Sequence, residues 1–289
     1  MGIRIIKKIN SKRINIDIKN INIIPDEIEK FIIKNLNKNA PESYSQITDL
    51  ELDKIKKNVF DTFKLDINKH IIASIKSAYM KNYIIKNHFT LNKNSKIIID
   101  EYPKIGVLKL STKFNLSPMT IIRFVFDKLY HIKLKELLAS KKLSNYDQQQ
   151  FELADKNDIY VTLNQVEQSE QSILFENIIA SEFLVKNNIE FKTQEELTQE
   201  QIIKYGKAIN TPDFLITSEL IINSKKINWI DAKNFYGSNI DFIVSKVKKQ
   251  IKKYLDTYGP GCLIFNHGFN SKLAFNDVLI LDYDSIKLE

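Results

Sequence analysis

The spacing of apolar residues changes near residue 150, and this change limits the folds open to the chain. From Asp26 to about Ser140, apolar residues recur at threes, fours and fives, which is typical of amphipathic helices. After Ser169, helical stretches alternate with apolar runs of strand length. Such a mixture indicates a compact α/β domain. The sequence therefore predicts a helical domain over residues 1–150 and an α/β domain over residues 151–289.

Several classes of protein are excluded by composition. Lys, Asn or Asp interrupts every Ile-rich run, so no segment is apolar enough for a transmembrane helix and no membrane association is expected. Cys262 is the single cysteine, which rules out an intrachain disulfide and a zinc site built on paired cysteines. We expect a reducing compartment, the nucleus, the cytoplasm or both.

Charge is divided unevenly between the two halves. Residues 1–150 contain 28 Lys+Arg and 15 Asp+Glu, a net charge of +13, whereas residues 151–289 contain 15 and 20, a net charge of −5. A basic half favours a polyanionic partner, although a solvated face in a Lys-rich chain would look the same. Lys greatly outnumbers Arg, so we expect contacts with phosphates rather than reading of base sequence.

Residues 105–129 have the layout of a helix-turn-helix. The pattern predicts a helix over 105–114, a turn over 115–117 and a second helix over 118–129, with Ser117 as its N-cap and Pro118 as its first residue. In a DNA-binding motif of this type the second helix enters the major groove. The alternative is an ordinary helical hairpin.

The second of these helices carries the residues that would contact nucleic acid. Ile122, Phe126 and Leu129 form its expected apolar seam. Three polar side chains would then face phosphates or base edges, namely Thr120, Arg123 and Lys128.

Three acidic residues of the α/β half are expected to converge. The predicted elements are helices over 170–187, 195–207 and 240–254 and strands over 189–193, 213–217, 220–223, 227–233 and 262–265. Asp213 begins one strand, and Asp231 and Lys233 share a face at the end of another, because strand side chains alternate. A hairpin between them brings these strands together, and Glu176 on the first helix closes the group.

Carboxylates held this close repel one another unless a cation neutralises them. Oxygen ligands favour Mg²⁺ or Mn²⁺, and the backbone carbonyl of Ala232 adds a further oxygen beside Asp213, Asp231 and Glu176. A cation there polarises a phosphoryl oxygen and lowers the pKa of a bound water. Lys233 can orient that water or offset charge on the phosphate.

The following helix carries two further polar candidates and a basic face. Gln250 and Tyr254 are four residues apart, so both face the same way and can hydrogen-bond substrate or the residues around the acidic group. The same helix carries five lysines that either approach a phosphate backbone or are simply solvated: Lys246, Lys248, Lys249, Lys252 and Lys253.

Together these residues resemble the TPD-motif family of the PD-(D/E)XK nuclease superfamily. The resemblance rests on four strings: Thr211-Pro212-Asp213, Trp229-Ile230-Asp231-Ala232-Lys233, Tyr236-Gly237 and Tyr258-Gly259-Pro260-Gly261. It implies a restriction-endonuclease-like α/β fold with a mixed central sheet behind a helical, helix-turn-helix-bearing region. It further implies Asp213 and Asp231 as metal ligands and Lys233 as the catalytic lysine. Asp231 stands where we expect Glu in animal members, and either acid can bind a metal.

The function that follows is a Mg²⁺-dependent or Mn²⁺-dependent nuclease, with DNA favoured over RNA as substrate. Two alternatives stay open. One is an inactive nuclease-like adaptor that binds DNA or protein, and the other is an RNA-processing nuclease. In animals the resemblance implies a codanin-like protein partner. A homodimer would suit a nuclease that cuts both strands.

Overall fold

The computed structural model describes residues 13–140, 142–161 and 166–287, and within them the chain forms two compact units. The α/β unit comprises residues up to Lys30 together with Val166 onward, and the helical unit comprises Phe31–Gln165. The expected boundary near residue 150 is wrong, because it falls inside α8 (Asn145–Lys156), which packs against two other helices of the helical unit. Residues 1–12 lie outside the described residues.

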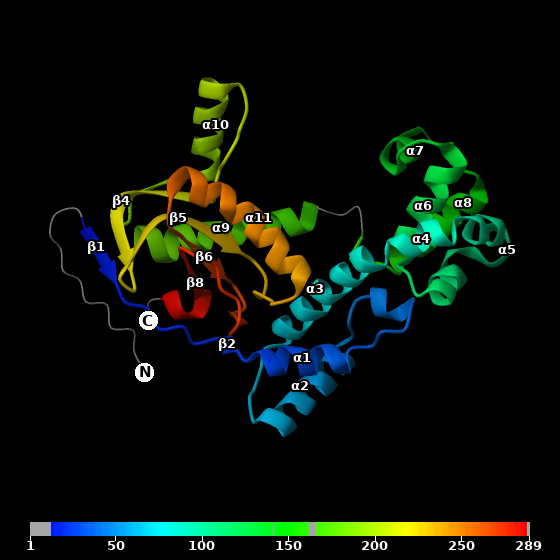
Figure 1. Ribbon diagram of the computed structural model, residues 1–289, viewed down its shortest axis with the longest axis horizontal. Coiled ribbons are helices and arrows are strands. Elements are labelled where there is room, and N and C mark those ends of the chain that lie inside the picture. Colours follow the sequence, from blue (N-terminus) through cyan, green and yellow to red (C-terminus); the bar gives the residue numbers. More distant parts are fainter. Residues whose placement is uncertain (1–12, 141, 162–165, 288–289) are drawn as a thin grey trace. The chain divides into compact units, whose positions relative to one another are not determined.

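The α/β unit is built on a mixed sheet (Figure 1). Within the described residues its central path runs β1-β4-β5-β6-β8, and β3 pairs with the same edge of β4 as β1 does. β4 pairs antiparallel with β3 and β5, and the other pairs of the sheet are parallel. The strand bounds are β1 (Arg13–Ile16), β3 (Phe191–Thr193), β4 (Phe214–Ile222), β5 (Lys225–Lys233), β6 (Gly261–Phe265) and β8 (Val278–Asp282).

The predicted hairpin is present between β4 and β5. Its two-residue turn, Asn223-Ser224, has positive φ at both positions, 51° and 64°, which matches the right-handed twist of the paired strands. The two short strands expected over 213–217 and 220–223 are one strand, β4, whose pairing with β5 shifts register between Leu215 and Leu220. That irregularity explains why the alternation of apolar residues is interrupted there.

Two helices cover opposite faces of the sheet. α9 (Val166–Ile179), followed directly by a π-helical turn η2 (Ala180–Val185), packs Phe175 and Ile179 into one core with Ile230 of β5. The neighbouring residue Trp229 points to the other face, where its ring lies 5.2 Å from the ring of Tyr254 on α11 (Asp241–Tyr258). Because strand side chains alternate, Asp231 and Lys233 lie on the α11 face with Trp229.

α10 (Gln194–Tyr205), which follows β3 and precedes β4 in the chain, projects away from the sheet (Figure 1). Thr193 and Glu196 form a capping box at its start, and Gly206, with φ of 75°, ends it in the left-handed conformation that glycine tolerates. A second, small sheet pairs β2 (Ile23–Ile24) with β7 (Phe269–Asn270). β7, β8 and the final turn η3 (Tyr283–Ile286) were not predicted.

The helical unit is organised around α6 (Pro118–Tyr130), which packs against α5, α7 and α8. Its core includes Ile121, Val125 and Phe126, none of them exposed to solvent. α1 (Asp26–Asn35) spans the division between the units. The other helices are η1 (Glu42–Tyr44), α2 (Asp49–Phe63), α3 (Lys69–Asn87), α4 (Phe89–Lys93), α5 (Ser95–Phe114) and α7 (Leu134–Ser140).

The local helix–turn–helix prediction is accurate at the turn. Asn115 ends α5 in the left-handed conformation, and the Ser117 hydroxyl accepts a hydrogen bond from the Thr120 N–H at the start of α6. The second helix is not an exposed one, because Ile121, Ile122 and Val125 are fully buried. Leu129, expected in the apolar seam, is 46% exposed. None of the described helices combines the length and apolarity needed to cross a membrane.

Candidate active site

Asp213 and Asp231 are brought together at the end of the β4–β5 hairpin. Asp213 directly precedes β4, and its Oδ2 accepts a hydrogen bond of 2.7 Å from the backbone N–H of Ala232. Asp231 is fully buried on β5, and its Oδ2 is paired with the ammonium of Lys233. The two carboxylates are therefore adjacent and largely removed from water.

Lys233 supplies the positive charge of this group. Its ammonium forms an ion pair with Oδ2 of Asp231 and donates a hydrogen bond of 2.9 Å to Oε1 of Gln250. Only 12% of its side chain is exposed. The amine is thus held beside the carboxylates by both β5 and α11.

Gln250 and Tyr254 connect α11 to the carboxylates. Nε2 of Gln250 donates to Oδ1 of Asp231 at 3.3 Å and to the hydroxyl of Tyr254 at 3.0 Å. The Tyr254 hydroxyl in turn donates to the carbonyl of Thr211 at 3.3 Å, two residues before Asp213. Both residues therefore position the site, and Tyr254 itself is buried against Trp229.

The closeness of the negative charges in this site shifts the pKa values of its carboxyl groups. Burial, followed by the charge of Asp231, raises the pKa of Asp213 well above its usual 3.8. The same two causes raise the pKa of Glu176 on α9 above its usual 4.5, so Glu176 lies within electrostatic reach of the pair. Burial alone would lower the pKa of Lys233, but the three carboxylates together raise it, which keeps the amine protonated.

The backbone of Ala232 also faces this group. Its N–H points toward Asp213. The N–H and C=O of one strand residue point to the same side, so the Ala232 carbonyl is directed toward the same edge of β5.

These groups fit a magnesium-type ion. The described residues contain no group of three His, Cys, Asp or Glu side chains that could hold a metal ion by themselves. Mg²⁺, however, is commonly bound by one or two carboxylates together with water and substrate phosphates. Asp213, Asp231 and the Ala232 carbonyl supply such oxygen ligands, with the Lys233 ammonium beside Asp231.

The helix-turn-helix candidates have different surroundings, all within the helical unit. Thr120 is buried, and its hydroxyl donates to Oγ of Ser117. The Arg123 guanidinium donates to the carbonyl of Val161 at 2.8 Å, and its Nε is buried. Lys128 alone is well exposed, with its ammonium 5.6 Å from the centre of the Phe124 ring. Thr120 and Arg123 therefore use their polar groups inside the unit, which contradicts the expectation that they face nucleic acid.

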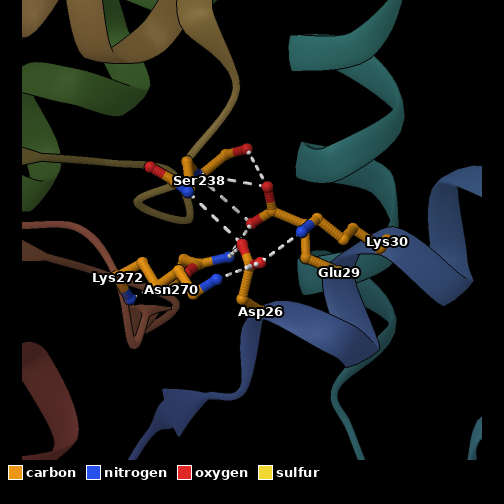
Figure 2. Close-up of polar contacts among 7 residues, drawn as sticks. Asp26, Glu29, Lys30, Ser238, Asn270 and Lys272 are labelled. Carbon is orange, nitrogen blue, oxygen red and sulfur yellow. Dashed lines mark hydrogen bonds and ion pairs between the residues drawn. The ribbon is translucent and has the colours of Figure 1, made fainter.

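A second buried group of carboxylates, formed by Asp26 and Glu29, was not predicted from the sequence (Figure 2). Glu29 of α1 accepts hydrogen bonds from the Ser238 hydroxyl at 2.9 Å and from Nδ2 of Asn270 at 3.0 Å. Asp26, one turn earlier, pairs with Lys30 at 2.7 Å and Lys272 at 3.2 Å. This group fixes the segment between Lys233 and α11, and no local signal links residues so far apart along the chain.

One comparison with known proteins covers the part of the chain that contains this site. Residues 142–284 match the family described as "Protein of unknown function TPD sequence-motif". A protein of Acanthamoeba polyphaga mimivirus, "Uncharacterized protein L539", is 25% identical over 278 residues, covering 77% of this chain and 96% of the viral protein. The "CDAN1-interacting nuclease 1" of Mus musculus is 26% identical over 99 residues, covering 34% of this chain and 33% of the mouse protein. No solved structure matches.

Proposed function

Because residues 142–284 belong to the TPD sequence-motif family, we propose that the α/β unit is a divalent-metal-dependent nuclease that hydrolyses phosphodiester bonds, with DNA as the favoured substrate. One observation carries the proposal: Asp213, Asp231, Lys233 and Gln250 form one buried polar group at the open end of the β4–β5 hairpin. The printed name of the mouse relative, a nuclease, supports it.

Each residue has a distinct part in the proposed chemistry. Asp213, Asp231 and the Ala232 carbonyl hold the metal, with Glu176 close enough to add an oxygen through water. When bound, Mg²⁺ polarises the phosphoryl oxygen and lowers the pKa of a coordinated water. The protonated Lys233 offsets the negative charge that develops on the phosphate during attack. Gln250 keeps the amine directed at the site, and Tyr254 keeps Gln250 in place.

A cleavage assay tests this proposal. Wild type, Asp213→Ala and Lys233→Met would be incubated with labelled single-stranded, duplex and flap DNA and with RNA, each in Mg²⁺, Mn²⁺ and EDTA. We expect wild type to cut only with metal and both variants to lose about 10²-fold or more in rate, the loss typical of removing one charge-stabilising group. Asp256→Ala and Lys252→Ala, both exposed on α11, serve as matched controls that retain activity.

Two results would overturn it. Wild type that binds these substrates but cuts none in either metal has no nuclease activity. Equal rates for wild type and the Asp213 and Lys233 variants would locate catalysis elsewhere or in a contaminant. Cleavage of RNA alone would favour the RNA-processing function.

A second candidate function is a protein-binding adaptor. It is favoured by the printed name of the mouse relative, which describes interaction with CDAN1. A codanin-like partner is therefore a proposal for this chain too. It would predict that the Asp213 variant binds such a partner as tightly as wild type does.

A further inference from the structure

A pocket of about 300 Å³ opens beside the proposed active site. Gln250 and Tyr254 belong both to the pocket wall and to the hydrogen-bonded group around Asp231 and Lys233. We propose that this pocket holds one unpaired nucleotide of the strand that is cut, so that the substrate contains a single-stranded segment. The inference rests on the proposed nuclease function and specifies its substrate class.

Lysines on one face of α11 give the pocket its charge. Lys246, Lys249 and Lys253 line it, and their spacing of three and four residues aligns them along the helix. All three side chains are exposed. No carboxylate among the described residues pairs with any of them, so their charge is available to a polyanion. Lysine ammonium groups suit phosphate oxygens as mobile point charges.

The opposite wall offers groups suited to a nucleobase. Gln194 and Asn210 each donate one hydrogen bond from the amide nitrogen, to the Thr211 carbonyl and the Thr257 hydroxyl. The second N–H and the oxygen of each amide can hydrogen-bond base edges. Ile209, which is 51% exposed, offers an apolar surface. Proteins recognise single-stranded nucleic acid by combining stacking or apolar contact, base-edge hydrogen bonds and a basic track for the backbone. This pocket combines base-edge hydrogen bonds and a basic track with an aliphatic contact from Ile209.

The wall is held in place before any ligand binds. Oε1 of Gln201 accepts hydrogen bonds from the N–H groups of Ile209 at 2.6 Å and Asn210 at 3.0 Å. The Tyr258 hydroxyl donates to the Asn210 carbonyl at 2.7 Å. Gln194 donates from Nε2 to the Thr211 carbonyl at 3.2 Å. A preorganised wall reduces the entropy lost on binding.

The size of the pocket decides between single and double strands. A volume of about 300 Å³ is at the small end of ligand sites, which suits a single nucleotide. A duplex, whose major groove alone is about 12 Å wide, is far too large to enter. A strand whose phosphates follow Lys246, Lys249 and Lys253 therefore places a base against Ile209 only if that base is unpaired.

The test is a binding measurement on the whole chain in EDTA, where no cleavage occurs. Fluorescence anisotropy would compare a labelled 20-nucleotide single-stranded DNA, its duplex and the RNA of the same sequence. The pocket variant is Lys249→Gln with Lys253→Gln. Its matched control is Lys248→Gln with Lys252→Gln, which removes the same charge from the same helix outside the pocket lining.

We expect wild type to bind the single strand at least tenfold more tightly than the duplex. The pocket variant should weaken single-strand binding about tenfold, and the control should weaken it less than threefold. Loss of two phosphate contacts should also reduce the slope of log K against log salt by about 1.4, since each contact on a single strand contributes about 0.7.

Preference for the duplex, equal losses in the pocket and control variants, or no binding of any oligonucleotide would overturn the proposal. Its failure is distinguishable from failure of the nuclease function. Pocket-dependent binding without cleavage in Mg²⁺ would refute the nuclease alone, and Asp213-dependent cleavage without pocket-dependent binding would refute the pocket alone. RNA that binds as tightly as DNA would support the same pocket and would show that the pocket does not distinguish ribose from deoxyribose.

Discussion

Asp213 is the residue at which stability and the proposed chemistry conflict. Its carboxylate is buried next to Asp231, and both features raise its pKa, so the charged form is disfavoured in the folded protein. Asp213→Asn keeps an oxygen that can accept from the Ala232 N–H but removes the charge. We expect this variant to be more stable in EDTA by about 0.5–2 kcal/mol, the usual size of a stabilising substitution, and to lose cleavage.

Thermal unfolding in EDTA at neutral pH measures this difference. An increase of about 2–4 °C per kcal/mol is expected for a chain of this size. Asp256→Asn, at an exposed position of α11, is the control and should leave the midpoint unchanged. A lower midpoint for Asp213→Asn would mean that the carboxylate stabilises the fold, contrary to the electrostatic argument.

Much of the candidate site could be predicted residue by residue, because strand alternation and helix periodicity are local. Asp231 and Lys233 share a face for that reason, and Gln250 and Tyr254 do so on α11. The same logic did not reveal that Arg123 turns to the Val161 carbonyl. A polar side chain at helical spacing looks the same in sequence whether it meets solvent or an acceptor 38 residues away.

At the scale of elements, Glu29 links the first turn of α1 to the segment before α11, because its carboxylate accepts hydrogen bonds from Ser238 and Asn239. Burial raises the pKa of Glu29 above its usual 4.5, against the hydrogen bonds that lower it. The folded protein therefore binds this proton more tightly than the unfolded chain does. The stabilising contribution of Glu29 is complete below about pH 4.5 and is lost as pH rises through the raised pKa.

Glu29→Gln removes this titration. We expect the difference in unfolding free energy, wild type minus variant, to fall as pH increases from 4.5, and urea unfolding between pH 4.5 and 8 measures it. Glu27→Gln, an exposed position on the same turn, should give a difference that is flat over this range. A difference that stays constant or grows for Glu29→Gln would show that the carboxylate is better accommodated charged.

Element prediction succeeded where capping and turn chemistry mark the ends. Ser117 caps α6 as predicted, and the Asn223-Ser224 turn makes the hairpin expected between the strands of Asp213 and Asp231. It failed for β7 and β8, because β7 has only two residues and β8 follows a loop without periodicity. Their strand state comes from pairing: β7 pairs with β2, which is distant in sequence, and β8 pairs with the nearby β6.

For the whole molecule, the first thirty residues matter to a unit that lies mostly after residue 165. Ile16, Ile18, Ile24 and Ile28 are all buried, and each such side chain contributes about 1.5–3 kcal/mol. Together they rival the total stability of an ordinary domain, about 5–15 kcal/mol. A chain that starts at residue 31 should therefore lose the cooperative folding of the α/β unit and keep that of the helical unit.

Trp229 reports on this directly, since it is the only tryptophan and is fully buried in the α/β unit. In the shortened chain its emission should shift toward that of solvent-exposed tryptophan, while the far-ultraviolet signal of the helical unit persists. Unchanged emission and an unchanged urea midpoint would contradict the dependence on residues 1–30.

The boundary between the two units was the feature hardest to predict from the sequence. Charge and periodicity both change near residue 150, yet α8 packs with α5 and α6, and β1 pairs with β4. The local spacing of apolar residues indicates which helices and strands form. It does not indicate which elements pack together, because packing between elements far apart in sequence depends on the whole core.

The pairing of β1 with β4 also sets an order of events on the ribosome. Ile16 and its neighbour Ile222 are 206 positions apart, and at about 5–20 residues per second roughly 10–40 s pass between their syntheses. The helical unit is translated in that interval and can fold as it emerges. The α/β unit must wait, because β1 and β2 are made before the helical unit and its other described strands after it.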